Sequence, residues 1–211
     1  QRRQELEAAA EQLSSERKAQ ALQLEKAIET ELKDLNFAEV QFQIHFDKLA
    51  DYTADGVDDV EFLISMNPGQ PVKPLAEVAS GGELSRTMLA IKTVMADRDE
   101  IETLIFDEID VGISGRTAQK VSEKMAVIGR NHQVICITHL AQIAAHADQH
   151  YLIEKTVDGG VTRTEIRKLS EEESIDELAR ILGGAEITET VRMSAREMKS
   201  MVKSNAVKNK K

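Results

Sequence analysis

The stretch TLIFDEIDVGISG, residues 103–115, decides how this chain folds, because four mostly apolar residues run directly into two carboxylates. A second short apolar run, QVICITH at residues 133–139, follows after a segment from Gly115 to Gly129 that has helical spacing. A strand, a crossover helix and a second strand form a β-α-β unit with parallel strands and a right-handed crossover. The pattern therefore predicts an α/β fold with a parallel core.

Candidate catalytic residues stand where these two strands end. Asp107 and Glu108 follow the first strand, and His139 follows the second. Parallel strands place their carboxyl ends at one edge of a sheet, so we expect these side chains to lie near one another. One carboxylate can help to hold a hydrated Mg²⁺ while the other accepts a proton from a water that attacks a phosphate. The alternatives are solvated acids on a surface strand and a histidine that only starts a helix.

Two adjacent glycines stand in VASGGELSRT, residues 78–87. Ser80 and Glu83 have the S-x-x-E spacing of a capping box, which predicts a helix beginning at Gly81 or Gly82. Each glycine lowers helix propensity by roughly 1 kcal/mol relative to alanine, so the pair needs another explanation. Backbone N–H groups at a helix start can approach an anion closely where no Cβ intervenes. The stretch is either a phosphate-binding helix start or a flexible turn.

Residues 1–36 contain neither glycine nor proline and are rich in Glu, Gln, Ala, Lys and Leu, which favours a long helix. Their apolar residues partly follow the spacing of a coiled-coil seam, so we expect the end of a coiled-coil arm. The alternative is a lone amphipathic helix that packs on the domain.

The remaining patterns predict strands and a further helix. Strict alternation of apolar and polar residues at 40–46 and again at 60–66 predicts an antiparallel strand pair. The runs HYLIEK and VTRTEIRKL flank VDGG as a hairpin, and Ser170 with Glu173 opens a helix that runs through Leu182. We expect a lobe at residues 37–203 and a basic flexible tail at 204–211.

Composition excludes several classes of protein. The net charge of -10, with no Trp and two Tyr, disfavours a broad nucleic-acid face with stacking aromatic residues. The single Cys136 leaves no disulfide framework or thiolate metal cluster, which indicates a reducing, cytoplasmic compartment. No apolar run approaches the roughly 20 residues that would span a bilayer, so we expect no membrane association.

One phosphate-binding element is absent from the sequence. Nowhere does the chain contain G-x-x-x-x-G-K-[ST], the loop that wraps phosphates and supplies a lysine. The chain also starts at Gln1 rather than at methionine, so we interpret it as a piece of a longer protein.

Taken in order, ASGGE, LIFDE, DVGISG and ITH resemble the signature, Walker B, D-loop and switch-histidine motifs of ABC-type ATPases. Ala79 and Glu83 depart from the usual LSGGQ signature in the way of the coiled-coil branch that maintains and repairs chromosomes. Within that branch, VASGGELSR, TLIFDEIDVGISGRTAQKV and VICITHLAQIAAHADQHYLIEK are similar to the bacterial RecN family. The likeness covers residues 37 to about 190.

The resemblance implies the carboxyl-terminal half of an ABC-type ATPase head: a parallel β-α-β core with flanking antiparallel strands, preceded by a coiled-coil helix. The amino-terminal half of the same head would supply Walker A. Two ATP molecules would be sandwiched between two copies of the protein, as a homodimer. DNA would be bound through the full-length protein.

The same resemblance implies a role for each motif residue. Ser80, Gly81 and Gly82 would meet the γ-phosphate held by the other copy, while the role of Glu83 stays open because the usual residue is glutamine. Asp107 would hold Mg²⁺ through water, and Glu108 would be the general base. Asp110 would lie in the D-loop across the dimer seam, and His139 would sense the γ-phosphate. Arg86 is a candidate interface residue.

The function that this implies is an ATP-driven clamp or tether in double-strand break repair, in the bacterial cytoplasm and associated with the nucleoid. Alternatives are the head of another SMC-like or Rad50-like ATPase, or a non-catalytic interaction module whose acidic pair only binds metal. We expect this chain alone to hydrolyse little or no ATP, because Walker A is missing.

Overall fold

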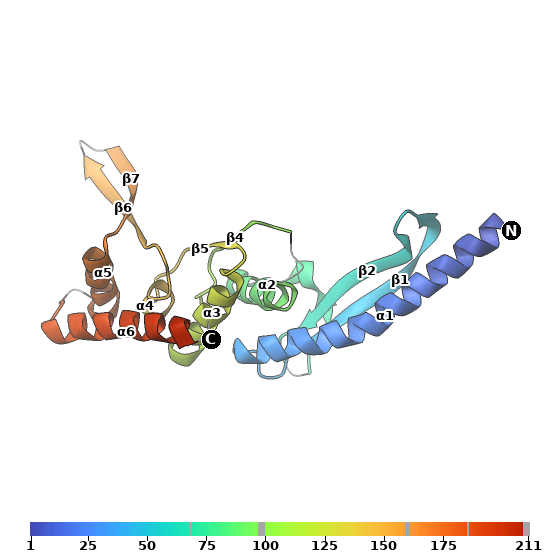
Figure 1. Ribbon diagram of the computed structural model, residues 1–211, viewed down its shortest axis with the longest axis horizontal. Helices are drawn as coiled ribbons and strands as arrows, with labels where there is room; N and C mark the ends of the chain where they lie inside the picture. Colours follow the sequence, from blue (N-terminus) through green and yellow to red (C-terminus); the bar gives the residue numbers. More distant parts are fainter. Residues whose placement is uncertain (68, 97–99, 159–160, 185, 209–211) are drawn as a thin grey trace.

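The computed structural model describes residues 1–67, 69–96, 100–158, 161–184 and 186–208. The chain is elongated: α1 and the β1–β2 hairpin form one end, α5, α6 and the β6–β7 hairpin form the other, and α2, α3, β4 and β5 lie between (Figure 1). The elements are α1 (Arg2–Asp34), β1 (Gln41–Thr53), β2 (Gly56–Ser65), β3 (Lys73–Pro74), the 3-10 helix η1 (Leu75–Glu77), α2 (Gly81–Met95), β4 (Thr103–Phe106), α3 (Gly115–Ile128), β5 (Gln133–Cys136), α4 (Ala141–Ala144), β6 (Tyr151–Asp158), β7 (Val161–Lys168), α5 (Glu171–Gly183) and α6 (Glu189–Lys208).

The first 36 residues form the predicted long helix, and α1 lies along the β1–β2 hairpin (Figure 1). Ile28, Leu32 and Leu35 are fully buried in the main core, whereas Leu6 and Leu22 remain exposed. This packing fits the alternative of an amphipathic helix on the domain, because no second long helix lies along α1 within the described ranges. A coiled-coil partner for α1 stays a prediction.

The predicted antiparallel pair is confirmed. Phe42 stands opposite Ile64 and Ile44 opposite Phe62, with the apolar face toward the core. β1 is an edge strand, and the carboxylates of α1 complete its hydrogen bonding: the N–H groups of Phe42 and Ile44 donate to Glu29 (3.1 Å) and Glu25 (2.7 Å). Unpaired strand edges invite pairing with other chains, so these bonds both blunt the edge and fix α1 in register with the sheet.

The β-α-β core is also confirmed. β4 and β5 pair in parallel from Thr103 opposite Gln133 to Phe106 opposite Cys136, and α3 forms the crossover between them. α3 buries an apolar stripe with helical spacing, made by Ala118, Val121, Met125 and Ile128. The sequence predicted buried strands, but one face of this two-stranded sheet is uncovered: the exposed fractions are 67% for Ile105, 44% for Ile135 and 49% for Ile137.

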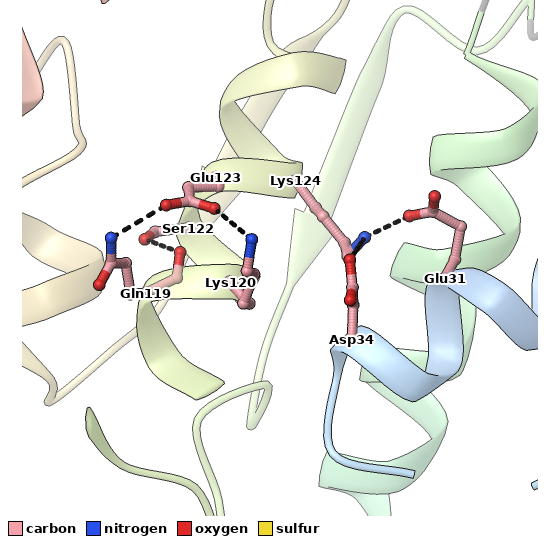
Figure 2. Close-up of polar contacts among 7 residues, drawn as sticks. All are labelled: Glu31, Asp34, Gln119, Lys120, Ser122, Glu123 and Lys124. Carbon is pink, nitrogen blue, oxygen red and sulfur yellow. Dashed lines mark hydrogen bonds and ion pairs between the residues drawn. The ribbon is translucent and has the colours of Figure 1, made fainter. Parts of the chain in front are cut away.

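An ion-pair cluster joins α1 to α3 (Figure 2). The ammonium group of Lys124 on α3 contacts the carboxylates of Glu31 and Asp34 in the last turn of α1, the second at 3.1 Å. Burial by itself opposes the charge of Lys124, but the two carboxylates outweigh that effect and raise its pKa. On the same helix, Lys120 and Glu123 pair near the surface, at 3.1 Å. Lys124 therefore fixes the end of α1 to α3, the crossover helix of the core.

The carboxyl-terminal end forms a unit with its own small core. β6 and β7 pair antiparallel as predicted, although Gly159 and Gly160 of the expected turn lie outside the described residues. Ser170 and Glu173 form a complete capping box at the start of α5. No sequence pattern predicted α6, and this helix includes residues 204–208 of the expected flexible tail; residues 209–211 are outside the described part. Buried residues of α4, α5 and α6 make this second core: Ala141, Ala144, Ile175, Leu178, Ala179 and Ala195.

None of the helices in the described ranges combines the length and the apolar character that crossing a membrane requires.

Candidate functional site

The candidate site is built around the turn that follows β4. Asp107 and Glu108 are exposed, and Asp107 Oδ1 accepts a hydrogen bond from the N–H of Glu108 (2.9 Å). Glu108 has a φ of 57°, in the left-handed region that non-glycine residues seldom adopt and that costs on the order of 1 kcal/mol. The strained residue turns the chain sharply at the strand end, so the next two residues, Ile109 and Asp110, are buried.

The first turn of α2 packs against this turn. Ser80 is the N-cap, and its Oγ accepts from the N–H of Glu83 at 3.4 Å. A Cβ on Gly81 would stand 2.0 Å from Oε2 of Glu108, and a Cβ on Gly82 would stand 3.0 Å from the carbonyl oxygen of Glu108. The resemblance implied that the two glycines make room for a nucleotide held by another copy of the protein. In the structure their bare backbone makes room for Glu108 of the same chain.

Two side chains of α2 also hold the turn through its carbonyl groups. Ser85 Oγ donates to the carbonyl oxygen of Asp107 at 2.7 Å. Arg86 Nη1 donates to the carbonyl oxygens of Ile109 (3.3 Å) and Val111 (2.8 Å). Burial lowers the pKa of the Arg86 guanidinium, and nearby Glu83 opposes that shift. Arg86 is only 7% exposed, so within this chain it makes an internal contact, and its candidate role at an interface stays a prediction.

Sequence reasoning predicted the start of α2 but did not identify its buried face, so it missed these contacts. The buried residues of α2 are Gly82, Arg86, Thr87, Leu89, Ala90 and Ile91. Gly82, Arg86 and Leu89 are spaced by four and three residues, so reading the arginine as part of a helical face would have found it.

His139 is joined to Asp110 and not directly to the acidic pair. Asp110 Oδ2 accepts from Thr138 Oγ1 (2.6 Å) and from the N–H of His139 (2.8 Å), and it lies 3.0 Å from Nδ1 of His139. The Asp110 side chain is 4% exposed and the His139 side chain 73% exposed. Within this chain the carboxylate of Asp110 points inward and orients the loop that carries His139. The implied place of Asp110 at a dimer seam stays a prediction. Thr138 was missed, although a polar residue that ends an apolar strand was the available signal.

Negative charge gathers at this edge. Burial, followed by the carboxylates of Asp110 and Asp107, raises the pKa of the neighbouring Cys136 thiol to about 12. A thiol with such a pKa is not a nucleophile near neutral pH. Among the residues that the structure describes, this edge offers carboxylates, an imidazole and the N–H groups at the start of α2.

The residues at this edge fit a magnesium ion that a nucleotide brings with it. Within the described ranges no group of three or more His, Cys, Asp or Glu residues is arranged to hold a metal. Asp107 is exposed, and one of its oxygens is engaged by the N–H of Glu108. Magnesium is commonly held by one or two carboxylates together with waters and substrate phosphates, so Asp107 alone is a sufficient protein ligand for that arrangement.

The chain is similar in sequence to DNA repair proteins. It is 46% identical over 198 residues to DNA repair protein RecN of Halalkalibacterium halodurans, which covers 92% of this chain and 35% of that protein. It is 43% identical over 192 residues to DNA repair protein RecN of Vibrio cholerae, covering 90% of this chain and 35% of the relative. The chain therefore spans about a third of the length of these curated relatives. No protein-family model matches it.

Solved SMC heads share the fold. The head domain with a coiled coil and joint derived from Pyrococcus yayanosii matches with a TM-score of 0.52 and 24% identity, over 77% of this chain and 29% of that one. The head domain with an extended coiled coil bound to the C-terminal domain of ScpA, derived from Pyrococcus furiosus, gives 0.50 and 22%, over 79% and 39%. At these identities the likeness concerns the fold alone, and it confirms the predicted α/β fold of an SMC-type head.

Proposed function

The chain belongs to the RecN family of DNA repair proteins, and on that premise we propose that it forms the carboxyl-terminal part of a head that hydrolyses ATP. The observation that carries the proposal is the packing of the first turn of α2 against the acidic turn after β4. This packing brings a helix N-terminus to two exposed carboxylates, and Asp110 of the same turn contacts the exposed His139. Helix N-termini favour anions, so the edge is suited to a phosphate.

Each residue of the edge has a chemical role in this proposal. Glu108 is the general base, because its carboxylate is exposed and can accept a proton from a water. Asp107 would hold Mg²⁺, which neutralises developing charge on phosphate oxygens when it is bound. Ser80, Gly81 and Gly82 present their end of α2 to the γ-phosphate of a nucleotide, and Glu83 stabilises that end as an acid in the first turn.

His139 is the phosphate sensor in this proposal, and Asp110 is its support. Nδ1 of His139 lies 3.0 Å from Oδ2 of Asp110, so this nitrogen faces the carboxylate, and Nε2 of the exposed ring is the nitrogen left for a phosphate oxygen. Asp110 therefore acts through His139 and does not contact the nucleotide.

The uncovered face of the β4–β5 sheet is the proposed place of the amino-terminal half, which carries Walker A. Parallel sheets occur almost only where both faces are covered, yet Ile105, Ile135 and Ile137 are exposed. Covering them would bury apolar area and bring the phosphate loop to the strand ends. A second copy of the whole head would then complete an ATP-bound dimer, and DNA would be bound by the full-length protein in the cytoplasm, at the nucleoid. Head closure with ATP and release on hydrolysis would make a clamp or tether for double-strand break repair.

The test mixes this chain with a separately expressed amino-terminal half that carries G-x-x-x-x-G-K-[ST], and follows phosphate release with and without DNA. We expect turnover only in the mixture. Glu108→Gln should lower turnover by about 10²- to 10⁴-fold and retain ATP binding. The matched control is Glu102→Gln, the same change at the exposed opposite end of β4, and it should leave turnover unchanged.

Two outcomes would contradict the proposal: full turnover with Glu108→Gln, or robust hydrolysis by this chain alone. A stable complex that binds ATP without ever hydrolysing it would favour the alternative, a non-catalytic interaction module in which the acidic pair only binds metal.

A further inference from the structure

Arg86 lies where three parts of the chain meet. Its Nη1 donates to the carbonyl oxygens of Ile109 (3.3 Å) and Val111 (2.8 Å), so it grips the turn after β4 from α2. Its guanidinium carbon lies 5.3 Å from the centre of the Phe37 ring, which follows the end of α1. These three contacts connect Arg86 of α2 to the end of α1 and to the turn after β4.

The burial of the Arg86 charge costs free energy. Arg86 is 7% exposed, and its Nε is buried with no hydrogen-bond partner among the described residues. Burying a guanidinium with one donor unsatisfied costs free energy that an apolar side chain of similar volume would not. Packing alone therefore does not account for an arginine here, and the feature that needs one is the pair of inward-facing carbonyl groups.

Those two carbonyl groups flank the residues that the proposed chemistry uses. Ile109 follows the left-handed Glu108, and Asp110, which holds His139, lies between Ile109 and Val111. Fixing the peptide units on both sides of Asp110 fixes the direction of its carboxylate and the turn that carries Glu108. Gly82 is part of the same arrangement, because a Cβ there would stand 3.2 Å from Nη1 of Arg86.

We propose that Arg86 is a positioning residue for ATP hydrolysis: by tying the carbonyl groups of Ile109 and Val111 to α2, it holds Glu108 and His139 in their reactive geometry. The inference rests on the proposed function. It does not place Arg86 in contact with the nucleotide.

The test uses the full-length protein with Arg86→Met, which keeps an unbranched apolar stem and removes every donor, and with Arg86→Lys, which keeps the charge but loses the fork. Because a misplacement of about 1 Å can cost on the order of 100-fold in rate, we expect kcat to fall by about 10- to 100-fold in both variants. KM and the affinity for a fluorescent ATP analogue should stay within about 3-fold. The matched control Arg163→Met, on exposed β7, should leave all three quantities unchanged.

A double-mutant cycle separates positioning from general damage. If Arg86 acts through Glu108 and His139, the loss caused by Arg86→Met should be smaller in the background of Glu108→Gln or of His139→Ala than in the parent protein. The proposal is overturned by an unchanged kcat, by parallel losses of kcat and ATP affinity, or by full additivity with both Glu108→Gln and His139→Ala. If Arg86→Met does not fold, Arg86→Lys is judged by the same criteria. Failure of the proposed function shows separately, as undiminished hydrolysis by Glu108→Gln alone.

Discussion

The two neighbouring glycines at the start of α2 should respond differently to the same substitution. In Gly81→Ala the new Cβ would stand 2.0 Å from Oε2 of Glu108, which is the far end of an exposed side chain. That carboxylate can rotate away to another staggered conformation at a cost of about 1 kcal/mol or less. Alanine has a helix propensity up to about 1 kcal/mol better than that of glycine, so the free energy of unfolding should change by less than about 1 kcal/mol.

In Gly82→Ala the new Cβ meets groups that cannot rotate away. It would stand 3.0 Å from the carbonyl oxygen of Glu108, 3.1 Å from Cβ of Val111 and 3.2 Å from Nη1 of Arg86. Arg86 itself holds that turn, so relief of one contact strains another. Overpacking of this kind costs about 1–3 kcal/mol, of which the better helix propensity returns about 1 kcal/mol.

The two variants are measured side by side in this chain, by urea and thermal unfolding followed with far-UV circular dichroism, since there is no Trp to report by fluorescence. We expect Gly82→Ala to be less stable than Gly81→Ala by about 1–2 kcal/mol, and each kcal/mol lowers Tm by about 2–4 °C in a chain of this size. The reasoning is refuted if Gly82→Ala equals or exceeds Gly81→Ala in stability.

Three further changes test other parts of the structure. Lys124→Met leaves Glu31 and Asp34 without their shared cation and should lower the free energy of unfolding by about 1–3 kcal/mol. Lys120→Met breaks only the surface pair with Glu123 and should lower it by less than about 1 kcal/mol. Equal losses would contradict a stabilising role for the ion pairs between α1 and α3. Burial, helped by the charge of Lys199, lowers the pKa of His150. The neutral ring therefore stabilises the fold fully above the ordinary pKa of about 6.5, and this stability is lost as the pH falls toward the lowered value. His150→Asn should flatten the dependence of the unfolding free energy on pH between about pH 7 and 5, and an unchanged slope would be contrary evidence. Glu25→Ala frees the N–H of Ile44 on the edge strand and should raise its amide exchange, whereas exchange equal to that of the parent chain would show that this bond does not protect the edge.

Much of the fold is readable in the sequence, because local patterns carry it. The alternation at residues 40–46 and 60–66 gave the strand pair, and the run into Asp107 with the helix from Gly115 gave the parallel unit. The capping box at Ser170 and Glu173 was found from two residues at fixed spacing, since the bonds that it forms are local.

The internal contacts of the site could not be predicted in the same way. The sequence pointed to the residues at the strand ends, but not to the contact of Asp110 with His139 or to the bonds from Arg86 to the turn. The implied places of Asp110 and Arg86 at an interface stay predictions. The left-handed Glu108 turns the chain away from the direction of β4, and a pattern of apolar residues contains no information about that turn.

The sequence by itself determined most of the elements, though not α6, and which chemical groups stand at the strand ends, because both depend on spacing along one strand or one helix. Only the tertiary structure decided how α2 meets the turn after β4. That contact joins residues more than twenty positions apart, and it is set by close packing: glycine leaves space for Glu108, and the buried Arg86 donates to the two carbonyl groups that the turn presents to it.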